Sequence, residues 1–193
     1  MDRLGIEHLR QTFESKLGGE LKTWDQLGPQ FSHKFFHKGE HIVRAGENWR
    51  DFYFIYEGVL RVYYLDSKGH EVNQHFYACG EVISPLSNQS VCQFNIQSLE
   101  STKLLTANYQ ALSATSSENT EWGQIELNLL KSSFLKNAKR EAQLLLSDAE
   151  NRYLWFCREY PQLVKKLPQY QIASFLGVTP VTLSRLKLNG PEL

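Results

Sequence analysis

Polar and basic side chains gather near the C-terminus, where they could contact nucleic acid. The candidate contact residues are Gln169, Tyr170, Thr179, Thr182, Ser184, Arg185 and Lys187. Their hydroxyl, amide and cationic groups donate hydrogen bonds to phosphate oxygens or to base edges. Between Tyr160 and Pro191 the chain has four basic residues and no acidic one. The chemistry and charge of this segment therefore favour binding to DNA.

Two short helices would have to position these side chains. The pattern predicts a helix from Gln169 to Leu176, a turn at Gly177-Val178, and a second helix with Thr179 as N-cap and Pro180 at its first position. The expected buried face comprises Ile172, Leu176, Val178, Leu183 and Leu186. Ala173 and Gly177 are small where the helices should approach. This pattern is typical of a helix-turn-helix, whose second helix enters the major groove. The alternative is a helix pair that only packs against its own chain.

Five histidines recur between residues 33 and 75 and raise the question of a metal-dependent enzyme. They are His33, His37, His41, His70 and His75. A cupin-type metal site needs two histidines one residue apart plus a carboxylate, and the sequence has no His-x-His. No spacing indicates a Ser-His-Asp or Cys-His site. We therefore expect surface histidines, no metal, no catalytic residue and no enzymatic activity.

The cysteines Cys79, Cys92 and Cys157 are widely spaced and include no Cys-x-x-Cys pair. This spacing predicts reduced thiols and neither a zinc site nor an iron-sulfur cluster. Cys92 is either a redox-responsive thiol or an inert buried one.

The N-terminus lacks the apolar stretch of a signal peptide, and no segment has the length and apolarity of a membrane span. We expect a cytoplasmic protein with no membrane partner.

Charge and composition narrow the class of protein. The 193 residues include 21 basic and 21 acidic ones, which excludes a uniformly basic protein that wraps DNA. A content of 41% hydrophobic residues supports a folded core. Since only Glu192 is acidic after Tyr160, the neutral total combines a mildly acidic body with a small basic tip.

The first two thirds of the chain change pattern at about residues 31 and 117. Before residue 31, a helical spacing of apolar residues runs through Leu4, Leu9, Phe13, Leu17 and Leu21. From Phe31 to about Tyr109, short strand-like runs alternate with glycines, as in a small antiparallel barrel or jelly roll. We expect tight turns at Glu57-Gly58 and at residues 66–69.

After residue 117 the period becomes helical, with Ser117 or Asn119 as the candidate cap. An imperfect coiled-coil seam runs through Leu127, Leu130, Phe134, Asn137, Glu141 and Leu144. A second apolar side comprises Ile125, Leu129 and Leu135. The helix either packs only on the barrel or also pairs with a second copy, and we predict a homodimer because two sides need covering.

The order of these parts resembles the Crp/Fnr family of transcription regulators. The matching stretches are 36–42, 45–47, 52–61, Gly80-Glu81, Ile172-Ala173, 176–179 and 182–186. The resemblance implies an α+β protein with an antiparallel β-roll or jelly-roll barrel, a long dimerisation helix and a small all-α helix-turn-helix domain. The corresponding boundaries are 1–117 for the sensor, 118–147 for the helix and 148–193 for the DNA-binding domain. Implied partners are double-stranded DNA and a second copy, with an unknown small-molecule effector and RNA polymerase as further possibilities.

The sensor departs from the family members that bind cyclic nucleotides. Those members use a Gly-Glu pair for the ribose and an Arg-Ser pair for the cyclic phosphate. Gly80 and Glu81 match the first pair, but Cys92 and Gln93 stand where the second is expected. A buried phosphate would lack a cationic partner, so we do not expect cyclic AMP in the usual mode. The family's iron-sulfur cluster is also not expected. The candidate pocket comprises these four residues and Asn137, which faces either the pocket or the helical seam.

The C-terminus departs from the family as well. Only residues 188–193 follow the recognition helix, so we expect no β-hairpin wing. Pro180 and Val181 replace the Arg-Glu pair that reads bases in the best-known members, and Arg185 remains to bind a guanine edge. The predicted function is a DNA-binding transcription regulator whose barrel controls the placement of paired helix-turn-helix units. The alternative is a ligand-sensing or protein-interaction module that does not bind DNA.

Overall fold

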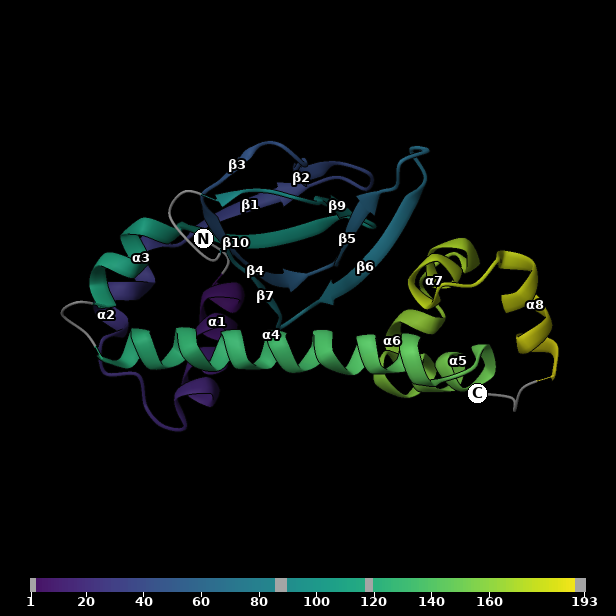
Figure 1. Ribbon diagram of the computed structural model, residues 1–193. Coiled ribbons are helices and arrows are strands. Elements are labelled where there is room, and N and C mark those ends of the chain that lie inside the picture. Colours follow the sequence, from purple (N-terminus) through teal and green to yellow (C-terminus); the bar gives the residue numbers. More distant parts are fainter. Residues whose placement is uncertain (1–2, 86–89, 117–119, 190–193) are drawn as a thin grey trace. The chain divides into compact units, whose positions relative to one another are not determined.

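The computed structural model describes residues 3–85, 90–116 and 120–189 (Figure 1). The chain begins with helix α1 (Arg3–Leu17), the short helix α2 (Trp24–Leu27) and the 3-10 turn η1 (Gly28–Gln30). Gly18 ends α1 with a φ of 80°, a conformation that favours glycine. The predicted helix was therefore too long, because Leu21 is buried beyond its end. Leu4, which the pattern placed on the apolar side, is exposed.

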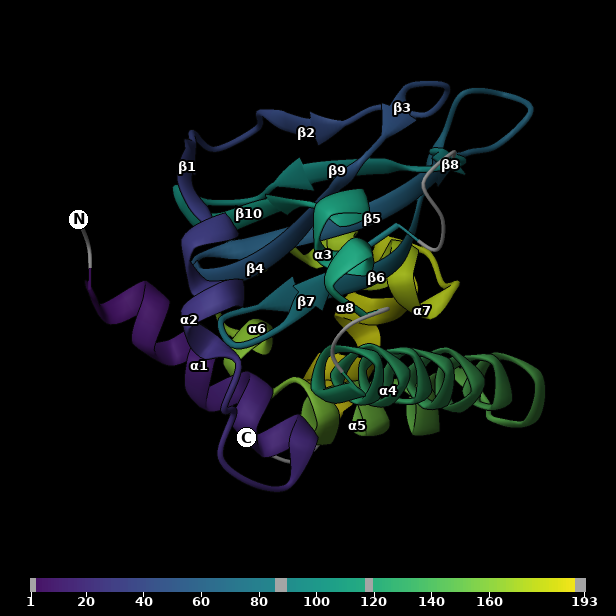
Figure 2. The same ribbon diagram turned by 90° about the vertical axis from the view of Figure 1, so that its left-hand side faces the viewer.

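Short strands form two four-stranded antiparallel sheets and one two-stranded sheet in the described residues (Figure 2). The sheet orders are β1-β10-β4-β7, β2-β9-β5-β6 and β3-β8. The strands are β1 (Ser32–Phe36), β2 (His41–Val43), β3 (Asn48–Trp49), β4 (Asp51–Glu57), β5 (Val59–Leu65), β6 (Glu71–Ala78), β7 (Val82–Ile83), β8 (Ser90–Val91), β9 (Asn95–Ser98) and β10 (Thr102–Asn108). The predicted fold class, α+β with an antiparallel barrel, is confirmed.

The turn at Gly58 has a different role from the hairpin turn at residues 66–69. Strands β4 and β5 belong to different sheets, so Gly58 carries the chain from one sheet to the other. Its φ is 103°, and a Cβ there would lie 2.8 Å from Thr102 Cα. Asp66 closes the second turn, because its carboxylate accepts hydrogen bonds from the amides of Lys68 and His70. This turn connects β5 to its neighbour β6 in one sheet.

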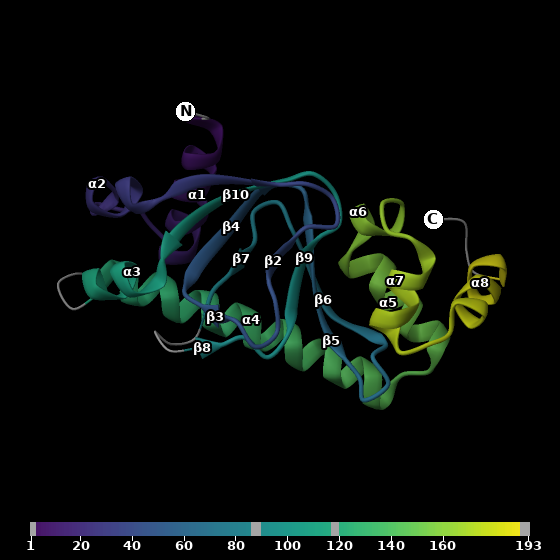
Figure 3. The same ribbon diagram turned by 90° about the horizontal axis from the view of Figure 1, so that it is seen from above.

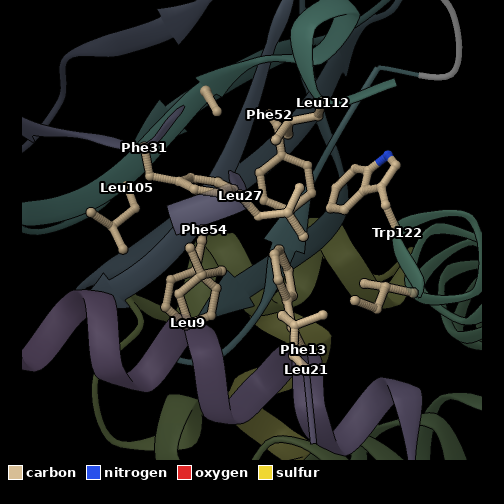
Figure 4. Packing of buried hydrophobic residues seen from close by; sticks show 12 residues of the cluster. Leu9, Phe13, Leu21, Leu27, Phe31, Phe52, Phe54, Leu105, Leu112 and Trp122 are labelled. Carbon is tan, nitrogen blue, oxygen red and sulfur yellow. The ribbon is translucent and has the colours of Figure 1, made fainter. Parts of the chain in front are cut away.

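A cluster of aromatic side chains joins the N-terminal helix to the barrel (Figure 4). The Phe13 ring makes edge contacts with Phe31, Phe52 and Trp122 at centroid distances of 5.7 to 6.0 Å. Trp122 and Ile125 come from helix α4 (Thr120–Leu146) and are fully buried. The start of α4 is therefore part of the same core as the N-terminal helix and the barrel. A second cluster fills the barrel with residues such as Val43, Trp49, Ile55, Leu60 and Ile96.

The chain divides into two compact units within α4. The first comprises Met1–Tyr64 and His75–Ser132, and the second Leu65–Gln74 and Ser133–Leu193. Helix α3 (Tyr109–Ser116) precedes α4. The predicted caps Ser117 and Asn119 lie outside the described residues. The tip of the β5-β6 hairpin thus belongs to the same unit as the C-terminal helices.

Four helices complete the second unit (Figure 3). They are α5 (Ala149–Glu159), α6 (Pro161–Val164), α7 (Gln169–Leu176) and α8 (Pro180–Asn189). Asp148 caps α5 by accepting a hydrogen bond from the Asn151 amide at 2.8 Å. The expected absence of a wing concerns residues 188–193, of which Leu188 and Asn189 continue α8 and 190–193 lie outside the described residues. None of the described helices combines the length and apolarity needed to cross a bilayer.

Candidate functional site

Helices α7 and α8 are joined by the turn that the sequence predicts. Gly177 ends α7 with a φ of 64°, and the Val178 amide donates to the Ala173 carbonyl at 3.0 Å. A Cβ at Gly177 would meet neighbouring atoms only at 3.4 Å or more, so its left-handed backbone, not close helix packing, is what calls for glycine. Thr179 caps α8, because its hydroxyl oxygen accepts from the Thr182 amide at 3.1 Å. Leu183 anchors the packed side of α8 and is fully buried.

The outward face of α8 differs in part from the predicted set. Val181, Ser184, Arg185 and Leu188 are exposed, and Val181 retains 62% of its accessible surface. Lys187 is only half-exposed, because it follows the buried Leu183 by about one helical turn. Thr182 is also half-buried, and its hydroxyl is bonded to that of Thr179 at 2.9 Å. Of the five predicted residues, Ser184 and Arg185 point outward, Thr179 caps the helix, and Thr182 and Lys187 are half-buried.

Lys187 lies near the buried thiol of Cys157 in α5. Burial raises the pKa of Cys157, while a hydrogen bond with Tyr153 and the positive charge of Lys187 partly oppose that rise. Gln169 and Tyr170 begin α7, and both are exposed. These two residues are available to contact a partner, whereas Lys187 is only half-exposed.

A polar cluster that the sequence analysis missed holds the hairpin tip to α7. The Asn73 side-chain amide donates to the Gln171 carbonyl at 2.9 Å, and the Asn73 backbone amide donates to Ser174 Oγ at 2.9 Å. Arg140 of α4 donates to the carbonyls of Asn73 at 3.0 Å and Phe175 at 2.9 Å. Its guanidinium also lies 4.7 Å from the centre of the Phe175 ring. Burial lowers the pKa of Arg140. No local sequence pattern predicts these contacts, because they join residues about 35 to 100 positions apart in the chain.

The Gly-Glu pair of the barrel forms a turn of its own. Gly80 has a φ of 86°, and its amide donates to the Ile55 carbonyl at 2.8 Å. The Glu81 carboxylate accepts from the Ala78 amide at 2.8 Å. Both residues thereby fix the entry into β7.

Cys92 is a packed thiol in the barrel core. It is 2% exposed, and its Sγ donates to the Phe94 carbonyl at 3.0 Å. Burial raises the pKa of Cys92, so at neutral pH this position presents a neutral thiol. Gln93 is exposed, and its amide donates to the Val91 carbonyl at 3.2 Å. Residues 86–89, between the two candidate pairs, are not described.

The long helix presents its predicted seam to solvent in the single chain. Leu127, Leu130 and Phe134 are 49%, 43% and 72% exposed. Asn137 is exposed too, and its side-chain oxygen accepts from Gln74 at 2.9 Å in the second unit. Leu144 is half-buried, and one of its methyl groups faces the Gly177 turn.

The second apolar side of α4 is split. Ile125 and Leu129 pack against the core of the first unit, whereas Leu135 is exposed. The helix therefore does pack on the barrel, but this packing leaves the seam uncovered.

The histidines do not form a metal centre in the part of the chain that is described, where no group of three potential ligands occurs. His33 Nδ1 lies 3.0 Å from the Tyr56 hydroxyl, and His41 Nε2 lies 2.8 Å from the Tyr63 hydroxyl. His75 is 1% exposed, so the expectation that all five are surface residues was wrong. Its position on β6, between the buried Asn73 and Phe76, explains the burial.

Comparison with known proteins finds similarity in the barrel and in the overall fold. Residues 33–119 match the cyclic nucleotide-binding domain family. The fold is similar to FixK2 from Bradyrhizobium japonicum, with a TM-score of 0.75 and 18% identity over 82% of this chain and 83% of that one. It is also similar to a protein from Eubacterium rectale assigned to the Crp/Fnr family of transcriptional regulators, with a TM-score of 0.68 and 14% identity over 88% and 86%.

A third similar structure is CLP, described as the c-di-GMP responsive global regulator of Xanthomonas campestris. Its TM-score is 0.66 at 14% identity, with 86% of this chain and 90% of that chain covered. No curated protein sequence matches significantly. At these identities the structural likeness establishes the fold alone.

Proposed function

We propose that this protein is a DNA-binding transcription regulator in which α7 and α8 act as a helix-turn-helix. The observation that carries the proposal is the exposed face of α8, where Ser184 and Arg185 stand free of the packed core. They lie in a segment without a carboxylate between Tyr160 and Pro191. Such a face can enter the major groove, with Arg185 positioned to bind a guanine edge through two hydrogen bonds. Gln169 and Tyr170 would contact phosphate from the start of α7.

The similarity in fold to regulators of the Crp/Fnr type supports this proposal. The proposal includes a homodimer joined along α4, in which two recognition helices could read successive major grooves about 34 Å apart. The seam would comprise Leu127, Leu130, Phe134, Asn137 and Leu144. The barrel would bias the dimer between geometries that do and do not match this spacing.

The barrel would sense something other than cyclic AMP in its usual mode. A neutral, packed Cys92 offers no positive charge to a cyclic phosphate. The candidate pocket would be formed by Gly80, Glu81, Cys92 and Gln93 of the first unit, and its effector would be a molecule that does not depend on a cation there. An iron-sulfur cluster is not part of the proposal.

Selection of binding sites from random duplex DNA with the purified full chain tests the proposal. We expect an enriched site whose affinity falls with rising salt, since phosphate contacts release counterions. Arg185→Ala should cost about 1–3 kcal/mol at one base position and relax the preference there. Arg158→Ala is the matched control, because it removes an exposed cation of the same unit from a helix outside the reading pair.

Absence of binding to any duplex at low salt, with or without cell extract as a source of effector, would refute the proposal. That result would instead favour a ligand-sensing or protein-interaction module. Equal loss of affinity in the Arg185 and Arg158 variants would show that charge alone, and not α8, contacts the DNA.

A further inference from the structure

The first turn of α8 is apolar at the positions that point outward. Pro180 and Val181 are both exposed, and Val181 retains 62% of its surface. Thr179, the residue before them, uses its hydroxyl oxygen to cap the helix. The hydrogen-bonding groups of the outward face begin only with Ser184 and Arg185. The part of a recognition helix that contacts base edges is its N-terminal part.

An apolar side chain at this position limits which base it can read. The major groove presents hydrogen-bond donors, acceptors and one apolar group, the C5-methyl of thymine. Val181 can neither donate to nor accept from a base, so only the methyl group offers it a favourable contact. Cytosine would place its amino group, which needs an acceptor, against the valine methyls.

Resting on the proposed function, we infer that Val181 reads the methyl group of a thymine in each half-site. The partner class is therefore a duplex with thymine close to the guanine that Arg185 binds. Val181 and Arg185 are one helical turn apart, about 6 Å along the axis. Base pairs rise by about 3.4 Å, so the thymine lies within about two base pairs of that guanine.

The surroundings of α8 favour a polyanion as the occupant of this face. Arg185 is an exposed cation on this face, and the segment around it also contains Lys165, Lys166 and Lys187 but no carboxylate before Glu192. The apolar contact would supply base preference, and the cations would supply most of the affinity.

The experiment replaces single thymines of the selected site by deoxyuridine, which removes only the C5-methyl group. We expect one thymine per half-site at which the replacement weakens binding about fourfold, the factor for about 0.8 kcal/mol per buried carbon. In the Val181→Ala variant the same replacement should leave the affinity nearly unchanged, with a ratio of the two affinities close to one. This loss of sensitivity identifies Val181 as the residue in contact with the methyl group.

Leu188→Ala is the matched control. Leu188 is another exposed apolar residue on the outward face, but it lies about two turns after Val181. The deoxyuridine effect should persist in this variant.

The possible failures are distinct. A site without a methyl-sensitive thymine near the guanine, or equal sensitivity in wild type and Val181→Ala, would overturn this inference and leave Arg185-dependent DNA binding intact. Failure to select any duplex would overturn both this inference and the proposed function.

Discussion

At the scale of single residues, burial decides what several reactive side chains do. Cys92 and Cys157 are buried with raised pKa values, whereas Cys79 is exposed. Cys92 thus fits the inert alternative better than the redox-responsive one, because a neutral thiol is a poor nucleophile. Burial likewise favours the neutral form of the Tyr153 phenol and raises its pKa to about 12.

Tyr153 provides a prediction about alkaline stability. Its folded-state pKa lies above the ordinary value of 10.0, so the folded state holds the phenol proton more tightly than the unfolded state. The resulting stability is fully present below about pH 10 and is lost as pH rises towards 12. Urea unfolding between pH 8 and 11.5 should show a steeper loss in the wild type than in Tyr153→Phe. Parallel curves would contradict the assignment.

Gly58 provides a prediction about the corner between the sheets. Gly58→Ala combines a left-handed backbone with a clash against Thr102, and we expect a loss of about 2–5 kcal/mol in the free energy of unfolding. Gly69→Ala is the matched control, because Gly69 also has a positive φ but nothing lies within 4 Å of its Cβ position. It should cost only the backbone strain, about 1–2 kcal/mol. Equal losses would mean that the contact with Thr102 relaxes without cost.

At the scale of elements, the second unit is held together by polar contacts as well as by aromatic packing. Rings of Trp155, Phe156 and Tyr160 surround Phe175 at centroid distances of 5.5 to 6.0 Å. Arg140 and Asn73 add hydrogen bonds that join α4, the hairpin tip and α7. A movement of the hairpin would therefore be transmitted to the first helix of the proposed reading pair.

Arg140 is the residue at which this link can be tested. Arg140→Ala removes two hydrogen bonds from a charged donor and a cation-ring contact, so we expect a loss of about 2–3 kcal/mol. Hydrogen exchange should accelerate in α7 and at residues 71–74. The exposed neighbour Lys139, changed to Ala, should stay within about 0.5 kcal/mol of wild type. Unchanged exchange in α7 would show that packing alone holds the hairpin.

At the scale of the whole molecule, the uncovered seam of α4 predicts self-association. Phe134→Glu places a charge at the most exposed apolar position of the seam and should convert a dimer to a monomer in sedimentation equilibrium. Leu135→Glu is the matched control, because Leu135 is 58% exposed on the same helix but lies off the heptad seam. A monomeric wild type, or equal dissociation in both variants, would contradict pairing along this seam.

The sequence by itself determined the elements whose signals are local. Glycine turns, the alternation of short strands, the Thr179-Pro180 helix start and the helical period after residue 120 all depend on neighbours within a few positions. These signals were enough for the fold class and for the α7-turn-α8 unit. They placed Ser184 and Arg185 outward correctly, but they placed Thr182 and Lys187 there as well, and both are half-buried.

Only the tertiary structure decided which faces meet. It half-buried Lys187 and buried His75. It also made the turn at Gly58 a corner between two sheets and joined Asn73 to Gln171. Each of these facts depends on contacts between residues that are distant in the chain or on the side of a helix that packs. Burial and charge at such positions follow from the assembled core, and no spacing within the sequence records them.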